Sequence, residues 1–183
     1  MPIDFQLMKR VVVIGTSCSG KTSFARQLAN QLSIPVIELD ELHWLPDWQM
    51  RPLEEFRAQV SEVAKQDHWV IDGNYSKVRD LVWPRATHLV WLNYPFGTVF
   101  SRALSRTFRR VATGEELFAG NRESLSRAIF DTESIVWWVL RTYGRRRREY
   151  PQLFQLPQNE HLEIIELNNQ VEADRLLAAV RGG

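Results

Sequence analysis

The sequence predicts an α/β fold in which a parallel sheet lies between two layers of helices. Five short segments are apolar almost throughout, and a helical pattern follows each of the first four. Strands that are apolar on both faces and alternate with helices are typical of parallel sheets covered on both sides. The expected strands are Arg10–Ile14, Pro35–Asp40, Trp69–Gly73, His88–Pro95 and Leu162–Leu167, and a final helix is expected over 172–180.

A loop bounded by two glycines follows the first expected strand. It reads GTSCSGKT, and the helical sequence SFARQLANQL comes directly after it. Backbone N–H groups of such a loop point inward, and the positive end of the following helix adds to their attraction for anions. The pattern therefore predicts a site for the phosphates of ATP, formed by Gly15, Thr16, Ser17, Cys18, Ser19, Gly20, Lys21, Thr22 and Ser23.

Two side chains of this loop have chemical roles of their own. Lys21 is expected to reach the β- and γ-phosphates and is therefore a catalytic candidate, while the hydroxyl of Thr22 is expected to ligate Mg²⁺. Cys18 is interpreted as a spacer, with a redox role as the alternative. Because Cys18 is the only cysteine, no disulfide framework can form, and a reducing compartment is expected.

Two insertions interrupt the alternation of strands and helices. Residues 41–68 are acidic and aromatic, with a helix expected near 53–66 after Pro52. Residues 97–150 are helical and rich in arginine, with a loop expected at 112–121. We interpret both insertions as covers for bound substrates, with extra packing helices as the alternative. The chain is expected to be one domain, 1–183, with its core in 8–40, 69–96 and 160–183.

The net charge of +1 hides an uneven distribution. Residues 38–67 contain eight acidic and three basic side chains, whereas residues 102–148 contain eleven arginines and five acidic side chains. Arginine is well suited to phosphate oxygens, so the basic part is expected to face a polyphosphate. The run Arg145–Arg148 is short and has no matching basic face, which makes nucleic acid an unlikely partner. The longest strongly apolar run, 135–140, is too short to span a membrane, and we expect a cytoplasmic protein.

The residues at the end of the third expected strand indicate whether the phosphate is transferred to an acceptor or to water. The segment reads WVIDGNY, so Gly73 follows Asp72. At this position, large ATPases with the same type of phosphate loop commonly carry a glutamate that positions water. The guanine-selecting pattern Asn-Lys-x-Asp is absent. Gly73 is instead expected to leave room for a ligand beside the backbone. These features favour transfer of phosphate to a bound acceptor.

Four segments together resemble the adenylate-kinase-related P-loop proteins. They are GTSCSGKTS, IPVIELDELHWLPDW, WVIDGNYS and HLVWLNYP, and they are most similar to the group called topology modulation protein FlaR-like. The resemblance covers about residues 9–170. It implies a P-loop NTPase fold with a five-stranded parallel sheet in the order 2-3-1-4-5. A substrate-binding insertion after strand two and an arginine-bearing helical lid after strand four are also implied.

The resemblance also assigns roles near strand three. The segment Asp72–Gly73 is similar to the DGFPR segment of adenylate kinases, which implies that Asp72 holds Mg²⁺ through water. Here NYS replaces FPR, so the arginine that grips an acceptor's phosphate is missing from its expected place. Arg51, Arg57 and Arg79 are the candidates to substitute for it.

Asp40 is the main candidate on the acceptor side. A carboxylate at the carboxyl end of a parallel strand lies at the ligand crevice, where it can take or orient the proton of an acceptor hydroxyl. The segment LDELH also resembles the GDxLH segment of gluconate-type kinases, in which the Asp faces the acceptor hydroxyl. The alternative is that Asp40 caps a helix. Further candidates for substrate contact are His43, with packing beside Trp44 as the alternative, and Gly73, Asn74 and Tyr75. Trp44, Trp48 and Trp69 are candidates to line the acceptor pocket, with covering of the sheet edge as the alternative.

Four arginines are candidates for the lid. Arg102 and Arg106 share one helical face and match the R-x₃-R with which adenylate kinase lids begin. Arg141 and Arg145 repeat the spacing beyond the expected loop and are candidates to bind the nucleotide. Converging guanidinium groups can neutralise charge on a transferred phosphoryl group, which makes Arg102 and Arg106 catalytic candidates. A solvated helix face is the alternative for all four.

The expected function is therefore transfer of the γ-phosphoryl group of Mg-ATP to a small acceptor, either a nucleoside, a nucleotide or a sugar-like molecule. The rival is a regulatory nucleotide-binding protein with slow hydrolysis and a link to DNA topology. Acceptor identity, donor base and oligomeric state stay open at this stage.

Overall fold

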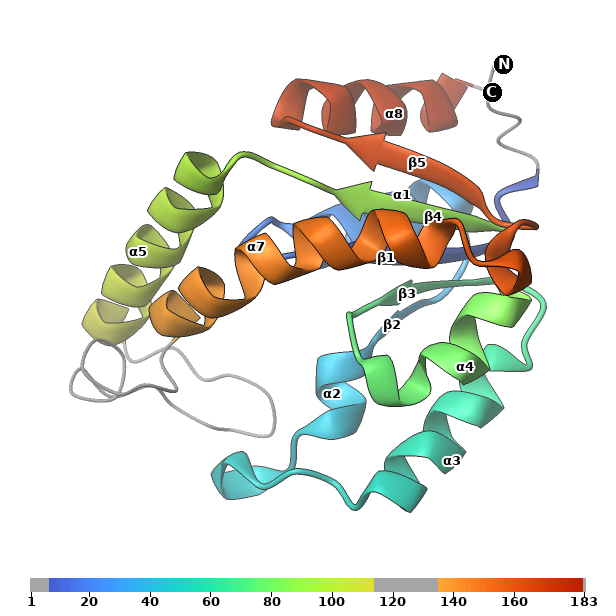
Figure 1. The fold of residues 1–183 in the computed structure, drawn as a ribbon, viewed down its shortest axis with the longest axis horizontal. Helices are drawn as coiled ribbons and strands as arrows, with labels where there is room; N and C mark the ends of the chain where they lie inside the picture. The colour runs from blue at the N-terminus through green and yellow to red at the C-terminus, as the bar shows by residue number, and fades with distance from the viewer. Residues whose placement is uncertain (1–6, 114–134, 183) are drawn as a thin grey trace.

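Five parallel strands form one sheet in the order β2-β3-β1-β4-β5, which confirms the expected order. The structure is a computed structural model and describes residues 7–113 and 135–182. Figure 1 shows the strands running side by side with helices on either side of them. The strands are β1 (Arg10–Gly15), β2 (Val36–Glu38), β3 (Trp69–Asp72), β4 (His88–Leu92) and β5 (Glu163–Leu167).

Helices connect the strands in the alternating manner that the sequence predicts. Short 3-10 turns at residues 46–48, 76–78, 83–85 and 157–159 complete the connections. No helix in the described part of the chain is long and apolar enough to cross a membrane. The helices are α1 (Lys21–Leu32), α2 (Leu39–His43), α3 (Leu53–Ala64), α4 (Arg79–Val82), α5 (Phe96–Thr113), α7 (Ile135–Phe154) and α8 (Gln170–Gly182).

The side chains of β1 divide between two hydrophobic cores, one on each face of the sheet. Val11 and Val13 pack in a core that includes residues of α1 and α8, while Val12 and Ile14 pack in a core with residues of α3 and α4. All four are buried, because a strand alternates its side chains between faces and both faces are covered here. Helix α7 contributes to both cores, and Figure 1 shows it crossing the sheet.

Strand β2 is shorter than the sequence predicts, and this changes the position of Asp40. The strand ends at Glu38, and Leu39 starts helix α2, so Asp40 lies in the first turn of a helix and not at the end of a strand. The expected N-cap role is wrong as well, since Glu38 occupies the N-cap position of α2. The physical reason is burial. The side chain of Leu39 packs in the core that contains Val12 and Ile14, called the second core below, and Glu38 is buried in an ion pair with Arg26.

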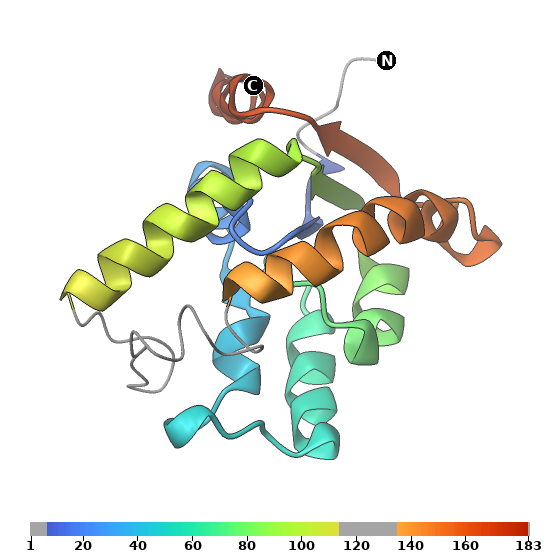
Figure 2. The ribbon, with the colours of Figure 1, turned by 60° about the vertical axis from the view of Figure 1, so that its left-hand side comes forward.

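The two insertions occupy different places around the sheet. Figures 1 and 2 both show α2, α3 and α4 on the side of the molecule opposite α8. The helix expected near 53–66 is α3, which ends at Ala64. In the second insertion the structure describes α5 and α7, which contact each other. Most of the loop expected at 112–121 lies outside the described residues.

Gly73 has a packing role rather than the open space that the sequence predicts. Its φ of 151° is unfavourable for other residues, and a Cβ atom there would lie 2.8 Å from the Cβ of Leu39. Because Glu38 and Asp72 are register partners, Leu39 comes level with Gly73 on the neighbouring strand. The space beside this glycine is therefore filled by Leu39 and not by a ligand.

We predict that Gly73→Ala lowers the free energy of unfolding by about 1–3 kcal/mol, through backbone strain and overpacking against Leu39. Urea unfolding followed by circular dichroism measures it. Gly144→Ala is the matched control, since a Cβ at this position of α7 meets nothing within 4 Å. Helix propensity predicts a gain of up to about 1 kcal/mol for the control. Equal effects of the two substitutions would contradict the packing role.

Candidate active site

The phosphate loop lies between the end of β1 at Gly15 and the start of α1 at Lys21. Two of its residues have left-handed backbone conformations, Cys18 with φ 65° and Gly20 with φ 94°. The N–H of Ser19 donates to the carbonyl of Thr16 at 3.0 Å, which closes the turn. The loop thus has the compact form that directs backbone N–H groups toward a bound anion.

Gly15 is the tightest position of the loop. A Cβ there would lie 2.7 Å from the hydroxyl oxygen of Ser19 and 2.8 Å from the carbonyl oxygen of Leu92. The space that a side chain would need is thus taken by the loop itself and by the end of β4. Glycine is required here by close backbone packing.

Lys21 folds back over this loop. Its Nζ lies 3.4 Å from the carbonyl oxygen of Thr16, which it contacts as a donor. Burial lowers the pKa of Lys21, the nearby carboxylate of Asp72 raises it, and the Arg146 guanidinium lowers it. The position is the one expected of a lysine that reaches phosphates bound in the loop.

Thr22 and Asp72 form a pair of oxygen ligands beside the loop. The Thr22 hydroxyl donates to Oδ2 of Asp72 at 2.6 Å, and Asp72 is 5% exposed. Burial raises the pKa of Asp72, while the Lys21 charge opposes this shift. The buried Oδ1 of Asp72 has no hydrogen-bond partner among the described residues. Mg²⁺ takes one or two protein oxygens together with substrate phosphates and water, so this donor set fits it.

Asn74 joins the end of strand β3 to the phosphate loop. Its Oδ1 accepts a hydrogen bond from the N–H of Gly15 at 3.1 Å, and its Nδ2 donates to the carbonyl of the same residue. The sequence predicts Asn74 as a substrate contact, but both ends of its amide bond the protein backbone. The structure therefore places it as a support of the loop.

Asp40 and Tyr75 form a polar pair on the side where the sequence predicts the acceptor. The Tyr75 hydroxyl donates to Oδ1 of Asp40 at 2.6 Å, and no described residue donates to Oδ2. Burial and the Asp40 charge raise the pKa of Tyr75, so the phenol stays neutral. Asp40 also acts on the pKa of Lys21, which locates it near the phosphate loop although it does not end a strand. The free oxygen suits an acceptor hydroxyl.

His43 and Trp44 belong to an aromatic cluster next to Asp40. The His43 ring packs against Trp44, Phe56 and Tyr75 with centroid distances of 4.9, 5.1 and 4.7 Å. Burial lowers the pKa of His43, which keeps the imidazole neutral at pH 7. Trp44 and Trp48 form a further edge-on contact at 5.7 Å.

Trp69 does not share this position. It is fully buried at the start of β3, in the second core, so it cannot line an acceptor pocket. It does not cover the sheet edge either, because β3 is an inner strand of the sheet.

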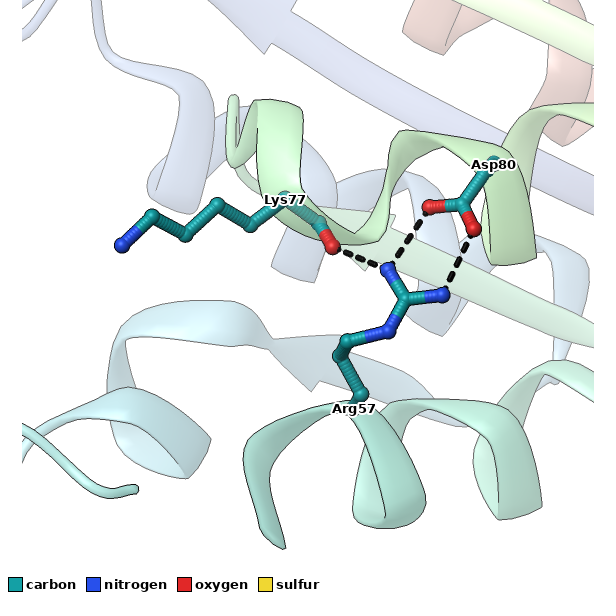
Figure 3. Close-up of polar contacts among 3 residues, drawn as sticks. All are labelled: Arg57, Lys77 and Asp80. Atoms are coloured by element: carbon teal, nitrogen blue, oxygen red, sulfur yellow. Dashed lines mark hydrogen bonds and ion pairs between the residues drawn. The ribbon is translucent and has the colours of Figure 1, made fainter. Parts of the chain in front are cut away.

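The three arginines considered as substitutes for a phosphate-gripping arginine all have partners within the protein. Figure 3 shows Arg57 of α3 gripping both carboxylate oxygens of Asp80, at 2.9 and 2.7 Å, and the carbonyl of Lys77. Arg51 donates to the carbonyl of Leu42 at 2.7 Å. Arg79 lies 3.5 Å from a carboxylate oxygen of Glu149 and stacks over Trp83.

Arg102 anchors α5 to the phosphate loop. Its guanidinium donates to the carbonyl of Ser19 at 2.8 Å and to the side-chain oxygen of Gln170 at 2.9 Å, and it stacks over Tyr94. These residues border a cavity of about 280 Å³ that opens beside the loop and is also lined by Ser19, Gly20, Ser23, Phe24, Gln27 and Leu177. Arg106, one turn further along α5, is half-buried and has no partner among the described residues.

Arg146 reaches the phosphate loop from α7, and sequence reasoning missed it. Arg141 and Arg145 are exposed, whereas Arg146 is half-buried with Nη1 3.4 Å from the carbonyl oxygen of Gly15. Burial lowers the pKa of Arg146. The spacing in the sequence does indicate Arg146. Thr142, Arg146 and Tyr150 are four residues apart, so they share one face of the helix, and Thr142 and Tyr150 are buried.

Comparison with known proteins places this architecture among P-loop proteins. The sequence model of the isopentenyl transferase family (IPT), a P-loop family, matches residues 8–74. No curated protein sequence matches the chain significantly.

Several solved structures share the fold over almost their whole length. Shikimate kinase from Acinetobacter baumannii, solved in complex with shikimate, has a TM-score of 0.58 at 14% identity, covering 96% of this chain and 92% of that one. For shikimate kinase from Aquifex aeolicus the values are 0.54, 15%, 94% and 96%. For a gluconokinase from Sinorhizobium meliloti they are 0.51, 18%, 96% and 95%. The chain therefore has the fold of the P-loop kinases.

The position of Arg146 leads to a prediction. Arg146→Ala should weaken binding of inorganic tripolyphosphate about tenfold, because a charge-assisted contact at the loop is lost. Isothermal titration calorimetry at constant ionic strength measures it. Arg145→Ala removes an equal charge from an exposed neighbouring position and should leave the affinity nearly unchanged. Equal losses in both variants would show that only the general charge of α7 matters.

Proposed function

We propose that this protein is a kinase that transfers the γ-phosphoryl group of Mg-ATP to a hydroxyl group of a small molecule. The observation that carries the proposal is the convergence of two pairs on one phosphate loop. Thr22 and Asp72 form the donor-side pair, and Tyr75 and Asp40 form the acceptor-side pair. The carboxylates of Asp72 and Asp40 both raise the pKa of Lys21, so one residue of each pair lies close enough to this lysine to act on its charge.

On the donor side, the loop and its neighbours bind the triphosphate. Backbone N–H groups of residues 16–18 and 20–23 and the Lys21 ammonium group hold phosphate oxygens, whereas the N–H groups of Gly15 and Ser19 bond within the protein. Thr22 and Asp72 would hold Mg²⁺, which neutralises phosphate charge when bound. The cavity bordered by Tyr94, Arg102 and Gln170 has the volume and position for the nucleoside part of ATP.

On the acceptor side, Asp40 orients the reacting hydroxyl. The acceptor oxygen forms a bond to the γ-phosphorus while the bond from that phosphorus to the bridging oxygen of ADP breaks, and the hydroxyl proton passes to Asp40. The hydrogen bond from Tyr75 fixes the carboxylate so that its other oxygen faces the acceptor. Arg106 and Arg146 supply positive charge to the transferred group, since such transition states depend mainly on alignment and charge neutralisation.

Further proposals follow from the same features. The structural similarity to kinases and the glycine after Asp72 support transfer over a regulatory role with slow hydrolysis. The motifs around the loop support membership of the adenylate-kinase-related, FlaR-like group. We place the chain in the cytoplasm as one domain, in which the segments 41–68 and 97–150 cover the acceptor and the triphosphate.

We predict that ATP binding depends on Lys21 and on Mg²⁺. Lys21→Ala should abolish turnover and weaken ATP binding about tenfold or more, because a half-buried cation placed to contact phosphate is lost. Calorimetry with and without EDTA, together with an ADP-release assay, measures both. Equal affinity and equal turnover in wild type and variant would refute the donor site.

We predict that Asp40→Asn and Arg106→Ala affect the rates of transfer and of background hydrolysis differently. The first should suppress transfer while ATP affinity and background hydrolysis survive, because Asp40 serves the acceptor. The second should raise the barrier of both transfer and hydrolysis by about 2–4 kcal/mol, because Arg106 serves the transferred phosphoryl group. Steady-state kinetics with and without an acceptor separate them. If Asp40→Asn loses ATP binding outright, Asp40 belongs to the donor site instead.

A further inference from the structure

The charges around Asp40 indicate what kind of molecule accepts the phosphate. We propose that the acceptor is an uncharged alcohol, of the nucleoside or sugar type, and not a carboxylate or a phosphate ester. The class of acceptor presupposes the phosphotransfer proposed above, and it differs from that of shikimate, which one of the similar kinases holds.

The carboxylate of Asp80 binds the guanidinium group of Arg57 in the same way that the carboxylate of an anionic substrate would bind it. A guanidinium fork binds a carboxylate through two parallel hydrogen bonds, and Asp80 makes both of these bonds to Arg57, at 2.9 and 2.7 Å. The carbonyl of Lys77 takes a further donor of the same group (Figure 3). Phe56, the neighbour of Arg57 on α3, packs against His43 and Tyr75, so helix α3 borders the acceptor side.

The other basic side chains of this part of the chain are occupied in the same way. Within residues 39–85, all of which are described, three of the four arginines lie within 4 Å of a carboxylate, and Lys65 pairs with Glu62. The fourth, Arg85, donates to the carbonyls of Ala64 and Lys65. Lys77 alone has an ammonium group without a hydrogen-bond or ion-pair partner, and it is exposed to water. Arg146 belongs to the phosphate side, because its guanidinium lies at the carbonyl of Gly15.

Apart from the exposed Lys77, whose charge adds to burial in lowering the pKa of His43, the groups that remain around the acceptor are neutral or negative. The imidazole of His43 is neutral because burial lowers its pKa, the phenol of Tyr75 is neutral, and Asp40 is the one carboxylate between them. An anionic acceptor would bring its charge beside Asp40. The cations that act on these groups are Lys21 and Arg146, which belong to the phosphate side, and Lys77, whose charge is screened because it is exposed to water. The like charges of Asp40 and the acceptor would therefore repel. The half-buried rings of His43 and Trp44, which pack against each other, suit the apolar face of a sugar or a nucleoside.

The experiment uses acceptors in matched pairs that differ only in an anionic group. Suitable pairs are glucitol and gluconate, methyl shikimate and shikimate, and nucleosides and their 3′-monophosphates. Phosphorylated product and ADP release are measured with the full chain and Mg-ATP. We expect kcat/KM for the uncharged member to exceed that for the anionic member about tenfold or more.

The outcomes separate this inference from the proposed function. Equal or faster transfer to the anionic members would overturn the acceptor class and leave phosphotransfer standing. Absence of ATP-dependent product from every pair, in a protein that still binds Mg-ATP, would overturn phosphotransfer and the acceptor class together.

A substitution at Asp80 tests the reason for the preference. Asp80→Asn weakens the fork contact and frees Arg57, so the anionic member of each pair should gain about tenfold relative to the uncharged one. Glu62→Gln is the control, because it breaks an exposed ion pair with Lys65 on the same helix and should leave the ratio unchanged. An unchanged ratio in Asp80→Asn would overturn the role assigned to Arg57.

Discussion

The bond between the Asn74 amide and the backbone of Gly15 is the interaction on which the geometry of the site depends. Strands β1 and β3 are neighbours, with Val13 the register partner of Asp72, so Asn74 comes level with Gly15 just beyond the paired residues. Its amide then bonds both polar groups of the glycine. Because the phosphate loop starts at this glycine and Asp72 lies two residues before the asparagine, one side chain links the loop to the proposed metal ligand.

Opposite charges lie close together at the centre of the site. Lys21 and Arg146 are both desolvated cations, and Asp40 and Asp72 are the carboxylates that act on the pKa of Lys21. Desolvated cations lose favourable interactions with water that bound phosphate can restore. A triphosphate bound as proposed would therefore meet cations that are already held in place, and the cost of assembling like charges would be met by folding.

The two sides of the site differ in how their arginines are paired. The proposed acceptor side, between α2, α3 and the end of β3, contains arginines that are already paired and aromatic rings that pack together. The proposed donor side contains Arg102 and Arg146, whose guanidinium groups contact backbone carbonyls of the loop itself. Carbonyl oxygens are weaker partners than carboxylates, so these guanidinium groups are the more readily available to phosphate.

Local sequence alone determined the strands, the phosphate loop and the helix after it, because these depend on apolar runs, on glycine at fixed spacing and on short-range hydrogen bonds. The order of the strands followed from the family resemblance and proved correct. Tertiary structure decided what depends on register and on partners distant in sequence. It selected Arg146 instead of Arg141 or Arg145, because only one face of α7 meets the loop. It filled the space at Gly73 with Leu39 and moved Asp40 into a helix, because burial of Leu39 ends strand β2 early. It also paired Arg57 with Asp80 across two helices, which no spacing along the chain could indicate.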